Sequence, residues 1–273
     1  MIQLNNNLSV LPFYESTTQQ DRFKSYAYGE VYPLYTPKGN VIPFQIITAH
    51  SDATILSVAV FNADGTIVDN TLSSLFIANG FAKYAFTDYD VYVCPFFSSN
   101  SLLQSEGQYY LRVGLSNSKY YFSEVFTVVQ YTAGFMRIKW YDDEDLVMDN
   151  ERIVYALNGG AIFKNYLYLT SEVGKPDYVF EEEGEVRDGL FFPEKMISEK
   201  TYKFTFLAPE YLLDVMRFIR MSDYIEITSF GVTYICDTFQ LTPKWEAQGN
   251  LASVEVEFQT NTVAKRIGRD FTT

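Results

Sequence analysis

The sequence predicts a mostly β protein, with an N-terminal immunoglobulin-like β-sandwich followed by an α+β domain that has antiparallel strands and one main helix. Aromatic residues make up 17% of the 273 residues, and tyrosine and phenylalanine favour the pleated, half-buried surface of strands. Short apolar runs separated by turn signals fill the first half of the chain, which is typical of a sandwich. Helical spacing of apolar residues marks one segment in the second half. A chain of this length has room for two domains, each with its own core.

Residues 1–40 are predicted to form an aromatic N-terminal arm that carries loops and short extended pieces. Large rings seek burial, so the arm is expected to pack on a domain or on a neighbouring subunit. Tyrosine is also enriched in protein interfaces. The candidate interface residues are Tyr26, Tyr28, Tyr32 and Tyr35.

Residues 41–132 are assigned to the β-sandwich domain, and its first strand is expected near residues 42–47. The apolar, β-branched run at 55–61 is followed by Asn-Ala-Asp-Gly and a second short run at 66–68. An Asp-Gly pair between apolar runs predicts a hairpin, because both residues tolerate a positive φ.

A second hairpin is predicted later in the same domain. Residues 109–113 and 120–129 are rich in tyrosine, phenylalanine and valine, and a Gly-Leu-Ser-Asn-Ser-Lys segment separates them. The pattern changes around residues 130–134, so the domain boundary is placed there.

Residues 133–273 are assigned to the α+β domain. Residues 202–206 and 254–258 alternate between apolar and polar, which predicts strands with one buried face and one wet face. Residues 224–228 and 232–236 are predicted to pair as a hairpin around Ser-Phe-Gly.

The main helix is predicted over residues 209–221. Pro209 suits the first helical turn, and polar side chains at Asp214, Arg217 and Arg220 are expected to face solvent. The apolar side chains recur at helical spacing, at Leu212, Val215, Met216 and Ile219. One apolar face predicts that the helix lies across one face of the sheet.

The negative charge of the chain makes nucleic acid and anionic membranes unfavourable partners. The formal net charge is −13, and an acidic surface of this size repels nucleic acid and anionic membranes. The short basic run at 265–269 is interpreted as part of a solvated terminus. The first residues resemble no signal peptide, and no apolar stretch is long enough to span a membrane. Synthesis in a reducing cytoplasm is therefore expected, with no membrane contact.

Few residues are suited to catalysis. His50 is the single histidine, and with no G-x-S-x-G elbow and no cysteine nearby in sequence it is interpreted as a surface residue at a strand end. Cys94 and Cys236 lie far apart and are expected to be buried free thiols. Three scattered ligands do not make a zinc site, and no phosphate-binding glycine motif occurs. We therefore expect no enzyme activity and no cofactor.

Two acidic runs, at residues 142–145 and 181–185, are candidate cation sites. Hard cations bind clustered oxygens, but consecutive carboxylates diverge and the spacing of a calcium loop is absent. A solvated turn is the preferred interpretation of both runs, and a weak cation site is the alternative. A carboxylate-based glycan hydrolase is a third, weaker hypothesis for the chain.

Several stretches of the sequence resemble virion structural proteins of phages and prophages of Bacteroidetes hosts, including crAss-like phages. The resemblance extends over most of the chain and rests on residues 24–34, 42–46, 109–113, 121–128, 243–245, 251–258 and 262–265. It implies a tail or neck protein that is made in the host cytoplasm and incorporated into the virion. It also implies partners, namely further copies of itself in a ring and other virion proteins, and it brings no catalytic residues.

The sequence thus predicts a phage tail or neck structural protein that assembles through homo-oligomeric and heteromeric contacts. The alternative is a carbohydrate- or receptor-binding module on a virion or a bacterial surface, because exposed aromatic rings also bind sugars.

Overall fold

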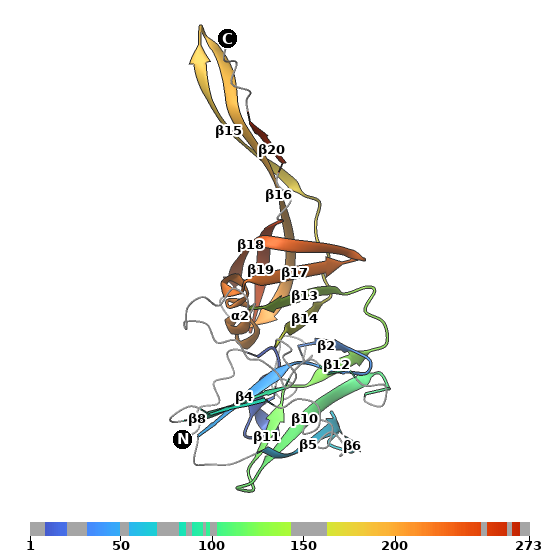
Figure 1. The fold of residues 1–273 in the computed structure, drawn as a ribbon. Helices are drawn as coiled ribbons and strands as arrows, with labels where there is room; N and C mark the ends of the chain where they lie inside the picture. Colours follow the sequence, from blue (N-terminus) through green and yellow to red (C-terminus); the bar gives the residue numbers. More distant parts are fainter. Residues whose placement is uncertain are drawn as a thin grey trace.

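The computed structural model describes residues 9–20, 32–49, 55–69, 82–85, 89–94, 97–98, 103–142, 163–246, 250–260 and 264–267. As predicted, the fold is mostly β, and the described residues contain a single α-helix. Figure 1 shows an N-terminal β region, a C-terminal sheet above it and a long β-hairpin that projects away from both. No helix among these residues is long and apolar enough to cross a membrane.

The main N-terminal sheet is built around strand β10. Its strands are β1 (Phe13–Tyr14), β2 (Leu34–Pro37), β5 (Ile55–Asn62), β6 (Ile67–Asp69), β10 (Gly107–Leu115), β11 (Tyr120–Ser123) and β12 (Phe126–Val129). One edge of β10 pairs with β5, and the other pairs with β11 and then β12. Both predicted hairpins are confirmed: β5 pairs with β6, and β10 pairs with β11.

The predicted strand at 120–129 is interrupted at Glu124 and Val125. Glu124 is buried, and its main-chain N–H donates to the carbonyl of Pro12 at 2.8 Å rather than to β10. Its carboxylate accepts the N–H of Val125 at 2.9 Å and the hydroxyl of Tyr14 at 3.2 Å. The backbone therefore leaves the ladder here, which lets β1 and β2 pair with the two halves of the strand.

A second, smaller sheet packs against the first. It consists of β4 (Phe44–Ala49), β7 (Ala82–Ala85) and β8 (Tyr89–Cys94). A separate two-stranded pair is formed by β3 (Asn40–Val41), which precedes β4 in the chain, and β9 (Phe97–Ser98), which follows β8. Phe44 and Ile46 are buried in the same cluster as Phe13, and the rings of Phe13 and Phe44 are 4.8 Å apart. The two sheets thus enclose a shared core, as in the predicted sandwich.

The C-terminal sheet has eight strands. They are β13 (Met136–Tyr141), β14 (Asn165–Leu169), β15 (Asp177–Arg187), β16 (Leu190–Pro209), β17 (Tyr224–Ser229), β18 (Val232–Trp245), β19 (Leu251–Thr260) and β20 (Ala264–Ile267). Their order is β14-β13-β17-β18-β19-β16-β15, with β20 also paired to β16. The strands predicted at residues 202–206 and 254–258 are confirmed as parts of β16 and β19, which pair with each other, and the predicted hairpin of β17 with β18 is confirmed as well.

Helix α2 (Glu210–Met216) is shorter than the sequence predicted. The four predicted apolar residues are all buried, but the chain tightens into a 3₁₀ turn at Ile219–Met221. In that turn the N–H groups of Met221 and Ser222 donate to carbonyls three residues earlier, at Phe218 and Ile219. A 3₁₀ turn is a common way to end a helix, because it satisfies carbonyls that the α-helix leaves free.

The N-terminal and C-terminal regions share one continuous hydrophobic core. Its buried members run from Val10 in the N-terminal segment to Phe258 in β19. All described strands of the main N-terminal sheet nevertheless precede residue 130, and all described strands of the C-terminal sheet follow residue 135.

Candidate functional site

The most unusual surface of the chain is the hairpin formed by β15 and the first half of β16. We call residues 177–200 the arm. Asp188 and Gly189 connect the two strands with φ values of 52° and 80°, which matches a two-residue hairpin turn whose twist suits paired strands. Ten or so residues per strand, at roughly 3.3 Å each, give an arm about 35 Å long. It projects from the body of the molecule on the side away from the N-terminal region (Figure 1).

One face of the arm is apolar. Residues that pair across antiparallel strands share a face, and Tyr178 lies opposite Lys200, Phe180 opposite Ser198, and Val186 opposite Phe191. Tyr178 is 58% exposed, Phe180 64% and Val186 71%. Large apolar side chains clustered on one exposed face mark an interaction surface.

The opposite face of the arm is the more acidic one, although it also carries the exposed side chains of Val179 and Leu190. Glu181, Glu183 and Glu185 lie on this face of β15, in alternation with Phe180, Glu182, Gly184 and Val186 of the first face, and all three side chains are exposed. Lys195 lies 3.4 Å from Glu183 across the hairpin. Residues 177–200 carry eight acidic and three basic side chains, so the arm has a net charge of −5.

The apolar face of the arm continues the core face of the C-terminal sheet. Along β16 the alternation that places Met196 on this face also places Tyr202 and Phe204 there. Phe204 is buried, and the ring of Tyr202 stacks on Phe258 at 5.4 Å. The same side of β16 is therefore covered by other residues of the chain in the C-terminal sheet and open to solvent in the arm.

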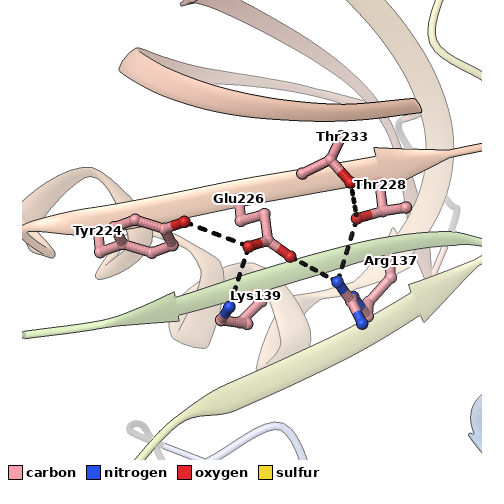
Figure 2. Close-up of polar contacts among 6 residues, drawn as sticks. All are labelled: Arg137, Lys139, Tyr224, Glu226, Thr228 and Thr233. Atoms are coloured by element: carbon pink, nitrogen blue, oxygen red, sulfur yellow. Dashed lines mark hydrogen bonds and ion pairs between the residues drawn. The ribbon is translucent and has the colours of Figure 1, made fainter. Parts of the chain in front are cut away.

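A second candidate site is a polar cluster on the outer face of the C-terminal sheet, centred on Glu226 in β17 (Figure 2). Its carboxylate accepts a hydrogen bond from the Arg137 guanidinium and another, at 3.0 Å, from the Lys139 ammonium. The hydroxyl of Tyr224 donates to it at 3.3 Å, and Arg137 also donates to Thr228 at 3.1 Å. Both cations come from β13, which pairs with β17.

Electrostatics keep Glu226 ionised. Burial opposes its charge, but the hydrogen bond and the charge of Lys139, together with Arg137, outweigh burial and lower the pKa of Glu226. Burial raises the pKa of Tyr224 and, to about 12, that of Cys236, and the charge of Glu226 adds to both shifts. A carboxylate with a lowered pKa is a poor proton donor near neutral pH. The hydrogen bonds of the cluster therefore link the outer-face side chains of three neighbouring strands, β13, β17 and β18.

Tyrosine rings border this cluster. The rings of Tyr141 and Tyr224 are 4.7 Å apart, and the ammonium of Lys164 lies 4.8 Å from the centroid of Tyr141. Tyr166 and Tyr168 of β14 share this outer face, because they pair with Lys139 and Arg137. Tyr168 is buried, whereas Tyr141, Tyr166 and Tyr224 are partly exposed. Partly exposed tyrosines beside charged groups form a surface that a sugar or a polar peptide could contact.

The predicted interface tyrosines divide between two situations. Tyr32 is 7% exposed within the single chain, and its hydroxyl donates to the carbonyl of Leu207 at 2.9 Å. The ring of Tyr35 is half-buried and lies 4.7 Å from that of Phe135. Both thus contact their own chain, which leaves Tyr32 little surface for a second one. Tyr26, Tyr28 and the predicted surface histidine His50 lie outside the described residues.

The structure also describes both cysteines and parts of the two acidic runs. Cys94 and Cys236 are free and buried, as predicted. The run at 181–185 is not a turn but part of strand β15. Of the run at 142–145, Asp142 alone is described. In the described part of the chain no group of three or more histidine, cysteine or acidic side chains is arranged to hold a metal ion.

The sequence contains a signal for the arm, although no hairpin was predicted there. Asp188-Gly189 lies between runs that contain valine, leucine and phenylalanine, which is the same pattern that identified the hairpin of β5 and β6. The four glutamates near it obscured the alternation of strand residues.

The sequence matches no protein-family model and no curated protein.

Proposed function

We propose that this protein is a structural component of a phage virion, in the tail or neck region, which assembles with copies of itself and with other virion proteins. The observation that carries the proposal is the arm, with an apolar face that the single chain leaves in solvent. Apolar area in water is unfavourable by about 25 cal/mol per Å², so a face of this kind is stabilised when another surface covers it. The resemblance of the sequence to virion proteins supports the same role.

The charge on the arm favours head-to-tail assembly over a two-fold dimer. Among the described strands β15 pairs with β16 alone, so its outer edge is open. If two copies paired these edges about a two-fold axis centred on the glutamate run, Glu181 and Glu183 would face glutamates of the second copy. Like charges placed opposite each other destabilise a strand pair. Contacts between unlike surfaces instead generate rings or filaments, which suits a virion component.

Light scattering on the purified protein tests assembly. We expect a mass well above the 31.4 kDa of one chain, and a Phe180→Ser, Val186→Ser variant is expected to shift it toward the monomer. Both side chains are exposed, so the variant should keep the far-UV circular dichroism of the wild type. A wild-type protein that stays monomeric at high concentration would contradict self-assembly. Mass spectrometry of particles purified from cultures that carry the gene tests the virion role, and intact particles without the chain would contradict it.

A second candidate function is glycan or receptor binding at the tyrosines around Glu226. The observation that favours it is the pairing of partly exposed rings with charged groups at Tyr141, Lys164 and Tyr224. A glycan array tests this function, with Tyr141→Ala as the variant that should lose binding and Tyr131→Ala, an exposed tyrosine elsewhere, as the control. An array on which the wild type binds nothing would argue against it.

A further inference from the structure

A groove on the core side of the C-terminal sheet lies between helix α2 and strand β18. Its volume is about 490 Å³. Buried Met216 and Phe239 contribute to its lining, and Leu241, Pro243 and the half-exposed Trp245 continue it along β18. Phe239 pairs with Phe258, which in turn pairs with Tyr202, so the groove opens on the same side of the sheet as the apolar face of the arm.

The groove has a charged rim. Glu210, Asp214, Arg217 and Arg220 line it beside the apolar residues. Asp214 lies 4.0 Å from Arg217 and offsets its charge. Arg220, by contrast, is exposed and makes no ion pair with any described residue. Glu210 likewise makes no ion pair with any described residue, so the groove combines an apolar lining with one unpaired cation, Arg220, and one unpaired anion, Glu210.

The arm carries the matching pattern. Glu182 lies on the apolar face of the arm, opposite Met196 and two residues after Phe180 on the same side of β15. It is exposed and, like Arg220, forms no ion pair within the described chain. The arm therefore presents apolar side chains with one unpaired anion, Glu182, and one cation, Lys200, whose ammonium lies 5.9 Å from the ring of Tyr178.

We infer that the α2–β18 groove of one copy receives the apolar face of the arm of a second copy, with Glu182 paired to Arg220. The inference rests on the proposed self-assembly and names the surface that the arm contacts. The arm cannot fill the groove of its own chain, because it is a paired hairpin that runs away from the body that holds α2 (Figure 1). Since donor and acceptor surfaces differ, each copy binds one neighbour through its arm and another through its groove, which propagates a ring or a filament.

A charge exchange tests the pairing. Glu182→Arg alone and Arg220→Glu alone each place like charges together, so each is expected to weaken association about tenfold or more by light scattering across a concentration series. The double variant carries both exchanges in every copy and is expected to recover to within about threefold of the wild type. Glu181→Arg makes the same charge change on the opposite face of the arm, and it is the matched control, expected to remain close to the wild type.

Mixing two defective chains tests the head-to-tail geometry. Phe180→Asp disables the arm and Trp245→Asp disables the groove, so each variant alone should be monomeric. The intact arm of the second can enter the intact groove of the first, and an equimolar mixture should therefore yield dimers that grow no further. Circular dichroism on each chain checks that it is folded.

The outcomes separate the two proposals. A monomeric wild type would contradict self-assembly and the groove contact together. If the wild type assembles and Phe180→Asp abolishes assembly, but the groove variants leave it unchanged, the arm contacts another surface and the groove is excluded. If the double charge exchange fails to recover, Glu182 and Arg220 are not partners.

Discussion

The hydroxyl of Tyr32 donates a hydrogen bond to the carbonyl of Leu207 at 2.9 Å and so joins two regions that lie 175 residues apart. Tyr32 belongs to the N-terminal segment, and Leu207 lies in β16, the strand that also forms half of the arm. The tyrosine ring is part of the hydrophobic core that both regions share. This bond therefore ties the N-terminal segment to the base of the strand from which the arm projects.

Removing the Tyr32 hydroxyl should weaken this connection. Tyr32→Phe keeps the ring in the core but leaves the Leu207 carbonyl without this donor, so the free energy of unfolding should fall by about 1 kcal/mol. Urea denaturation followed by tryptophan fluorescence measures the change. Tyr131→Phe is the matched control, because its hydroxyl accepts a single hydrogen bond on the exposed surface and its loss should have little effect. Equal stability of Tyr32→Phe and the wild type would show that water replaces the bond without loss.

The Glu226 cluster should make stability depend on pH. The pKa of Glu226 is lowered from 4.5 in the folded chain, so the unfolded chain binds the proton more readily. The stabilisation is therefore complete above the ordinary glutamate pKa and is lost as pH falls through the lowered folded value. Glu226→Gln should cost about 1 kcal/mol at pH 7, and its difference from the wild type should shrink below about pH 4.5.

Urea titrations of both proteins at pH 7 and pH 3.5 measure this effect. Glu255→Gln is the control, because Glu255 pairs with Lys244 on an exposed surface and such pairs contribute little. A Glu226→Gln deficit that is the same at both pH values would mean that lost packing, not lost charge, is the cause.

The local hairpins were predictable because their signals are local. Asp64 and Gly65 lie where the turn was placed, and the Thr66 N–H donates to the Asp64 carboxylate at 2.8 Å. Gly65 adopts the positive φ of 92°, whereas Asp64 does not. Apolar residues of α2 were predictable for the same reason, since helical spacing survives wherever one face is buried.

Long-range features could not be predicted in this way. The partnership of Tyr32 and Leu207 has no trace in the sequence near either residue. The break in the strand at Glu124 depends on Pro12 and Tyr14, which are more than a hundred positions away. For the arm, the local signal existed at Asp188-Gly189, but its projection from the body (Figure 1) depends on how the whole sheet is assembled.

Glu124 should be one of the most sensitive polar positions in the N-terminal sheet. Glu124→Ala removes the acceptor of the buried Val125 N–H and of the Tyr14 hydroxyl, and a buried group without its partner costs about 2 kcal/mol. The free energy of unfolding should fall by about that amount in urea denaturation. Glu106→Ala is the control, because Glu106 accepts the N–H of Gln130 on the surface and its removal should change stability by less than about 0.5 kcal/mol. Similar losses for the two variants would mean that water reaches the strand break.

The turn between β17 and β18 should be improvable by mutation. Phe230 and Gly231 have φ values of 48° and 79°, and a bulky side chain at a positive φ costs about 1 kcal/mol or more. Asparagine tolerates this conformation, and Phe230 is exposed, so Phe230→Asn should raise the free energy of unfolding by about 1 kcal/mol.

Thermal and urea denaturation measure this gain, and Gly231→Ala provides the opposite control. A Cβ at Gly231 would meet no atom within 4 Å, so a loss of stability in Gly231→Ala can come only from its positive φ. If Phe230→Asn is less stable than the wild type while Gly231→Ala behaves as expected, the exposed Phe230 ring stabilises the hairpin by more than its backbone strain costs. In that case the aromatic ring itself, rather than the turn geometry, explains why phenylalanine occupies this position.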